Sequence, residues 1–127
     1  MWKKWILALG LGFLAMFFAA CGGDSPKDVA IEATEAVFRG DSQKYLSYVV
    51  ITDEARRMGV NEGKVELVVR EAKKKADLSG GVKKLEILSE DIDGDKALVR
   101  IRAHFKNGTS EESTTRLRKI DNKWKIE

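Results

Sequence analysis

The sequence is poor in the residues that crosslink a fold or bind a metal. Its 127 residues include one cysteine, one histidine and one proline. A single cysteine has no partner for an intrachain disulfide, and one cysteine with one histidine is too few for an ordinary zinc site. The sequence therefore predicts a fold held by packing alone, with no metal and no cofactor.

Only one long hydrophobic run is present, and it lies at the N-terminus. Lys3 and Lys4 precede an apolar stretch over residues 5–18, and two alanines follow it. This is the layout of a secretory signal. The alternative is a transmembrane helix, but residues 5–20 would span roughly 24 Å, less than the ~30 Å of a bilayer core. We predict a cleaved signal peptide over residues 1–20.

The cysteine directly follows this run. The segment FAAC, residues 18–21, resembles the lipobox of bacterial lipoproteins, although Phe18 stands where that family usually has leucine. The resemblance implies a diacylglycerol on Cys21, cleavage just before it, a tether over residues 21–25 and a domain over residues 26–127. A plain secreted protein with a free thiol is the alternative. It is disfavoured because an unpaired cysteine is a liability in an oxidising compartment.

These features predict a protein anchored to a membrane of the bacterial cell envelope. Gly22 resembles the class sorted to the periplasmic face of the outer membrane where a cell has two membranes. In a cell with one membrane, we expect the outer face of the cytoplasmic membrane. Once Lys3 and Lys4 leave with the signal, the net charge falls to about +1, so the sequence favours no nucleic-acid partner.

The first half of the domain has the period of helices. Four capping positions mark the predicted helix starts: Ser25, Asp41 or Ser42, Thr52 and Asn61. Pro26 fits the first turn of the first helix, and Gly40 ends it. The helix that Asn61 opens should run to about Ala76. Its expected apolar stripe consists of Val65, Val68, Val69 and Ala72.

From Val82 the period of the apolar residues changes to two, which indicates strands. Leu85 and Ile87 mark a first strand, and a turn at Asp93-Gly94 follows. A second strand has one apolar face, formed by Ala97, Val99, Ile101, Ala103 and Phe105. After a third strand, Asp121-Asn122 turns into a last strand with Trp124 and Ile126 on one face. Helices followed by a four-stranded antiparallel meander predict an α+β domain, with N-terminal helices packed on a curved sheet.

The hairpin at Asn107-Gly108 allows two registers. A two-residue loop places apolar Val99 and Ala103 opposite charged residues. A three-residue loop, with Gly108 left-handed, places Ala97 beside Leu117 and Arg102 beside Glu112. We predict the second register because the apolar and charged faces then agree.

The order of these elements resembles a known superfamily. The segments SPKDVAIEATEAVFRGDSQKYLSYV and DNKWKIE resemble the nuclear transport factor 2-like superfamily, with its cystatin-like sheet, and in particular its small bacterial lipoproteins of unknown function. The resemblance spans residues 26–127. It implies a cone in which helices and sheet enclose a cavity. Some members are isomerases or dehydratases, and many are binding or docking modules, so the fold alone does not choose between them.

Few residues suggest a specific chemistry, and no catalytic residue is predicted. His104 falls on the polar face of its strand, which indicates a surface or subunit-contact position. The acidic residues 90–95 fit a solvated turn better than a calcium loop, and Lys73, Lys74, Lys75, Lys83 and Lys84 form the densest basic patch. Four aromatic residues are candidates for either a ligand cavity or the core: Tyr45, Tyr48, Phe105 and Trp124.

Two functions follow from this reading. The favoured one is a lipid-anchored binding or docking module without catalytic activity, whose partner is an envelope protein or a small apolar ligand. The alternative is a small cavity enzyme of the isomerase or dehydratase type, which needs titratable groups converging in a pocket. A homodimer through the open sheet face is a further candidate. That face bears Arg100, Arg102, Arg116 and Arg118.

Overall fold

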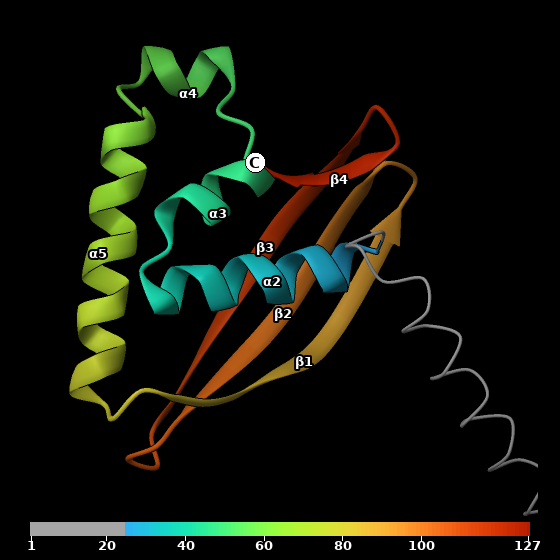
Figure 1. Ribbon diagram of the computed structural model, residues 1–127. Helices are drawn as coiled ribbons and strands as arrows, with labels where there is room; N and C mark the ends of the chain where they lie inside the picture. The colour runs from blue at the N-terminus through green and yellow to red at the C-terminus, as the bar shows by residue number, and fades with distance from the viewer. Residues whose placement is uncertain (1–24) are drawn as a thin grey trace, which may run out of the picture.

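A computed structural model describes residues 25–127 as four helices and a four-stranded antiparallel sheet in the order β1-β2-β3-β4 (Figure 1). The predicted signal peptide and Cys21 lie outside the described residues. The elements are α2 (Pro26–Arg39), α3 (Ser42–Tyr48), α4 (Asp53–Arg57), α5 (Glu62–Leu78), β1 (Val82–Asp93), β2 (Lys96–Phe105), β3 (Ser110–Ile120) and β4 (Lys123–Ile126). The predicted α+β class and the meander are confirmed.

The helix boundaries follow the predicted caps. The side chain of Ser25 accepts a hydrogen bond from the backbone N–H of Asp28, and Gly40 ends α2 with a φ of 78°. Asp41 rather than Ser42 caps α3. Thr52 and Asn61 cap α4 and α5. These caps satisfy backbone N–H groups that have no partner within the first helical turn.

The three-residue hairpin register is also confirmed. Ala97 pairs with Leu117, and Arg102 pairs with Glu112. Gly108 has a φ of 93°, in the left-handed region that favours glycine. Glu112 accepts hydrogen bonds from Arg102 and from Arg100, the latter at 2.8 Å. This one register therefore pairs apolar Ala97 with apolar Leu117 on one face of the hairpin and the opposite charges of Arg102 and Glu112 on the other.

The main core lies between α2 and the sheet. Small residues on α2, among them Ala30 and Ala33, let the helix approach the strands closely. The strands contribute Val99, Ile101 and Leu117, each at most 1% exposed. A second cluster contains Ala76, Ala103 and Phe105, with Phe38 packed edge-on against Phe105 at 5.7 Å between ring centroids. Burial of these side chains is the main term that stabilises the domain.

Helix α5 packs against α2 and α3 and stands to one side of the sheet in Figure 1. Its predicted stripe was wrong at one position, because Val68 is 65% exposed while Val69 is buried. A helix that contacts its neighbours along one narrow side buries positions near i, i+4, i+7 and i+11, here Val65, Val69, Ala72 and Ala76. No helix in the part of the chain that the structure describes has the length and hydropathy needed to cross a membrane.

Candidate functional site

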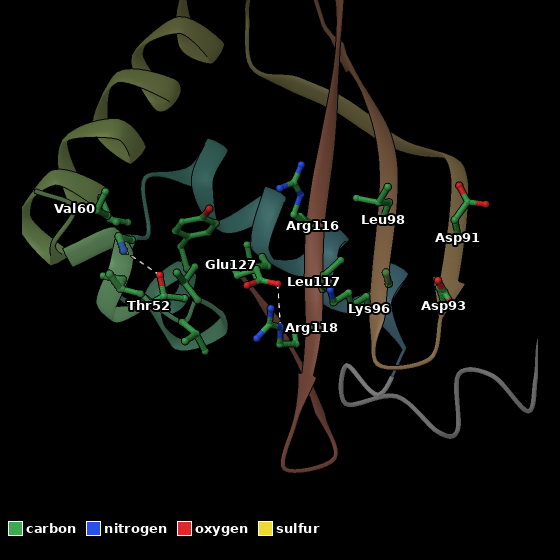
Figure 2. Close-up of a pocket in the computed structure, with 18 residues that line it drawn as sticks. Thr52, Val60, Asp91, Asp93, Lys96, Leu98, Arg116, Leu117, Arg118 and Glu127 are labelled. Carbon is green, nitrogen blue, oxygen red and sulfur yellow. Dashed lines mark hydrogen bonds and ion pairs between the residues drawn. The ribbon is translucent and has the colours of Figure 1, made fainter. Parts of the chain in front are cut away.

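A groove of about 860 Å³ lies where the α3–α5 region meets the ends of β3 and β4 (Figure 2). One wall is apolar and comes from the segment after α3 and the start of α5. It consists of Val49, Val50, Ile51, Ala55, Val60 and Val65. The sheet supplies Leu117 and Ile126 from its helix-facing side. A charged rim completes the groove: Asp91, Asp93, Lys96, Arg116, Arg118 and Glu127.

The apolar wall is tied to the sheet by backbone hydrogen bonds. The N–H of Val50 donates to the carbonyl of Ile126 at 2.8 Å, and Val49 forms a parallel bridge with the same residue. Thr52 caps α4, and the N–H of Val60 donates to the carbonyl of Ala55 at 3.0 Å. These contacts fix the path of a segment that has little regular structure. The groove is therefore a property of the folded domain and not of one element.

Of the three cations on the rim, Arg118 has an ion-pair partner among residues 25–127, whereas Lys96 and Arg116 have none. Arg118 pairs with Glu127, with Nε 3.2 Å from Oε2. Arg116 and Leu98 also line the groove. Leu98 pairs with Arg116 across the strands and is 42% exposed. The rim thus offers a guanidinium beside apolar surface, an arrangement that suits an amphipathic anion.

Three of the four predicted pocket aromatics, Tyr45, Tyr48 and Trp124, lie in or against the main core, and of the four only Tyr45 lines the groove. Tyr45 lines the groove, and burial raises the pKa of its hydroxyl. Tyr48 donates a hydrogen bond to Glu32 on α2. Phe105 belongs to the second cluster, and Trp124 belongs to the main core. Val60 and Val65 form much of the groove instead, and sequence patterns carry no signal for this, because it depends on the path of the α3–α5 connection.

Tyr48 gives a test of the packing of α3 on α2. Burial and the hydrogen bond to Glu32 raise the pKa of Tyr48 from 10.0 to about 12. Because the folded value exceeds the unfolded one, the stability gained from this group is complete below pH 10 and is lost as the pH rises toward 12. The chain has two tyrosines. In Tyr45→Phe, Tyr48 is the remaining tyrosine, and we expect ultraviolet titration of that variant to show tyrosinate forming near pH 12. Titration of this variant near pH 10 would contradict the assignment.

Several of the other residues noted in the sequence have side-chain partners in the structure. His104 lies on the outer face of the sheet, as predicted, with Nε2 2.8 Å from Oε1 of Glu86, and this contact lowers the pKa of Glu86. The carboxylate of Glu90 accepts a hydrogen bond from the backbone N–H of Lys27 at 3.0 Å. Within residues 25–127, no three His, Asp or Glu side chains are grouped as metal ligands would be. Two lysines of the basic patch pair with acids, Lys73 with Asp77 and Lys75 with Glu111.

Three solved structures resemble the domain. A candidate NTF2-like transpeptidase from Campylobacter jejuni is 31% identical, with a TM-score of 0.72, and the match covers 80% of this chain and 96% of that one. A DUF4783 family protein from Bacteroides ovatus is 18% identical with a TM-score of 0.56, covering 83% and 91% of the two chains. A SEC-C motif containing protein from Rhodopseudomonas palustris is 14% identical with a TM-score of 0.55, covering 87% and 80%. The last two show the fold alone.

No curated protein matches the sequence. A family model matches residues 19–127, which include the whole described domain and Cys21. The Campylobacter jejuni protein confirms the predicted nuclear transport factor 2-like fold, since it matches over nearly its whole length. The chain belongs to the family described as a domain of unknown function, DUF4878.

Proposed function

We propose that the protein is a lipid-anchored binding module of the bacterial cell envelope, without catalytic activity, which holds an amphipathic ligand in the groove. The groove carries this proposal, because it combines an apolar wall with the guanidinium of Arg116 on its rim, and Arg116 has no ion-pair partner within the described chain. Apolar surface gives affinity and a single well-placed charge gives orientation. The anchor is a lipid on Cys21, which supports a function at a membrane surface.

The groups available in the groove favour binding over catalysis. Covalent catalysis by a transpeptidase, as in the name of the Campylobacter jejuni protein, needs an activated hydroxyl or thiol. The hydroxyls lining this groove belong to Tyr45 and Thr52. Thr52 accepts the hydrogen bond that caps α4, and burial raises the pKa of Tyr45 and so disfavours its anion. Three acids line the groove: Asp91 and Asp93 are exposed, and Glu127 is paired with Arg118, so none of them is an unpaired buried acid of the kind an isomerase needs.

The groove can be tested with anilinonaphthalene sulfonate, a fluorescent probe that has an apolar body and one negative charge. We expect saturable binding to the mature chain, residues 21–127, and a loss of affinity of about tenfold in Val60→Glu, because the variant places a carboxylate on the apolar wall. Val60 is 38% exposed, so the variant should fold. Fluorescence titration measures the affinity, and thermal melting measures the fold.

Leu78→Glu is the matched control, since Leu78 is 81% exposed and lies at the far end of α5 from the groove. It should leave probe binding unchanged. Equal losses in the two variants, or no saturable binding, would contradict the proposal. If the wild-type chain cleaves a test peptide or ester, and Thr52→Ala or Tyr45→Phe abolishes that cleavage, the protein would be a cavity enzyme instead.

A further inference from the structure

Strand β3 extends well beyond the strand that covers its edge. Strand β4 pairs with residues 117–120 of β3, and the N–H of Glu127 then donates to the carbonyl of Arg116 at 3.1 Å. Within residues 25–127, no strand pairs with residues 110–115 on this side. We define residues 110–115 as the free edge of β3. This edge adjoins the groove, because the next residue, Arg116, lines the groove together with Glu127.

The backbone groups at this free edge follow from the alternation of the ladder. The N–H of Lys119 donates toward β2, to the carbonyl of Asp95, whereas the carbonyl of Arg116 accepts from the opposite side. Successive residues of a strand point their N–H and C=O groups to opposite neighbours. The groups of Ser110, Glu112 and Thr114 therefore point to the free edge, where such a row is a template for another strand.

The other edge of the sheet is blunted, and this one is not. Strand β1 pairs with β2 through two register shifts, between Val82 and Lys84 and between Ile87 and Ser89. Shifts of this kind kink an edge and disfavour further pairing. Strand β3 pairs with β2 without a shift from His104 back to Lys96. Its free edge is therefore regular enough to accept a strand.

Helix α5 presents an apolar side chain toward the free edge. Lys75 reaches β3, with Nζ 3.7 Å from Oε2 of Glu111. Val68 precedes Lys75 by seven residues, close to two helical turns, so the two share a face of α5. Val68 is 65% exposed. The helix-facing side of a strand added beside β3 would therefore lie near Val68. Val60 and Val65, which line the groove, lie near the N-terminal end of α5.

The charges along the free edge leave one cation unmatched. Glu112 is held by Arg100 and Arg102, and Glu111 lies near Lys75. Arg116 has no ion-pair partner in the described chain and lies on the outer face with Glu112. An acidic side chain on the outer face of an added strand would complement it, since opposite charges on neighbouring strands stabilise their pairing.

We propose that the free edge of β3 binds an extended peptide segment of another envelope protein as a fifth strand. Its apolar side chains face α5 and the groove, and its outer face carries an acidic residue beside Arg116. A second copy of β3 fits less well, because its helix-facing residues, Glu111, Ser113 and Thr115, are polar and would meet Val68. This inference rests on the proposed function, because it names the class of ligand that the groove binds.

The test uses the full lipidated chain in nanodiscs and short synthetic peptides. The probe peptide alternates valine with threonine and has one central glutamate; a second peptide has lysine there, and a third has a scrambled order. Hydrogen exchange at single-residue resolution should show the amides of Ser110, Glu112 and Thr114 protected by about tenfold when the first peptide is added. The scrambled peptide should give no protection.

Two pairs of variants separate backbone pairing from charge. Thr114→Pro removes an edge N–H at a position where a sheet tolerates proline, and it should abolish peptide protection, whereas Thr114→Ala should keep it. The wild type should prefer the glutamate peptide over the lysine peptide by about fivefold, and Arg116→Glu should reverse that preference. Circular dichroism checks that each variant is folded.

The failure of this inference can be told from the failure of the proposed function. If the wild type binds the peptide without protection of the three edge amides, and Val60→Glu abolishes that binding, strand addition is overturned and the groove remains a binding site. Loss of both peptide and anilinonaphthalene sulfonate binding would overturn both. Protection of the three amides that rises with protein concentration in the absence of peptide would show β3 pairing with a second copy, and would overturn the peptide assignment.

Discussion

Replacing Leu117 with alanine is expected to lower the free energy of unfolding by about 3 kcal/mol, within the range for removing a buried leucine side chain. Leu117 is 0% exposed and belongs to the core between α2 and the sheet. It sits at the point where β3 is paired with both β2 and β4. Strand β3 is held by hydrogen bonds on both sides at this position, so it cannot move freely to fill the cavity.

Leu98→Ala provides a matched control for this prediction. Leu98 lies on the neighbouring strand, one residue from the partner of Leu117, but on the outer face and 42% exposed. Its truncation should cost about 0.5 kcal/mol, because a half-exposed side chain loses little burial and leaves no cavity. Urea denaturation of the two mature chains measures both values. Equal losses would mean that the assignment of inner and outer faces is wrong.

The second large effect concerns the anchor. We expect Cys21→Ser to abolish attachment to the membrane when it is combined with Phe18→Ala, which gives an ordinary signal peptidase the small residues it needs to remove residues 1–20. The proposed diacylglycerol on Cys21 would supply the two acyl chains that stable anchoring requires, at about 0.8 kcal/mol per buried methylene. The protein should then move from the membrane fraction to the soluble envelope fraction almost completely.

Mass spectrometry of the wild-type protein gives the complementary measurement. The membrane-extracted chain should begin at Cys21 and carry the mass of a diacylglyceryl group. A chain that still includes residues 1–20, or a free thiol on Cys21, would contradict lipid anchoring. Asp24→Asn, which alters the predicted tether without touching the cysteine or the Ser25 cap of α2, should leave both the mass addition and the membrane fraction unchanged.

Local features of the sequence predicted much of the fold. The caps at Ser25, Thr52 and Asn61 were predictable because a capping side chain bonds to backbone only two or three residues away. The register of the β2–β3 hairpin was predictable because a slip of one residue would bury Arg102 and expose Ala103. Both signals act within a few residues or across one tight turn.

The candidate site was not predictable in the same way. The four aromatic residues carried no information on which of them meets a groove, because that depends on how α3 and α5 pack on α2. Val68 reads as part of a buried stripe, yet α5 turns that face toward the free edge of β3. Arg116 was recognisable as an outer-face residue, but its lack of an ion-pair partner in the described chain became visible only beside Arg118 and Glu127.

The sequence by itself determined the prediction of a lipid-attachment site at Cys21, the order of helices and strands, and the face on which each strand residue lies. These depend on chemical character and on the period of neighbouring residues. The tertiary structure alone decided where the groove opens, which aromatic residues are core, and that β4 leaves part of β3 uncovered. Those features arise where segments far apart in the chain meet, and no local pattern specifies the distance or angle at which they do so.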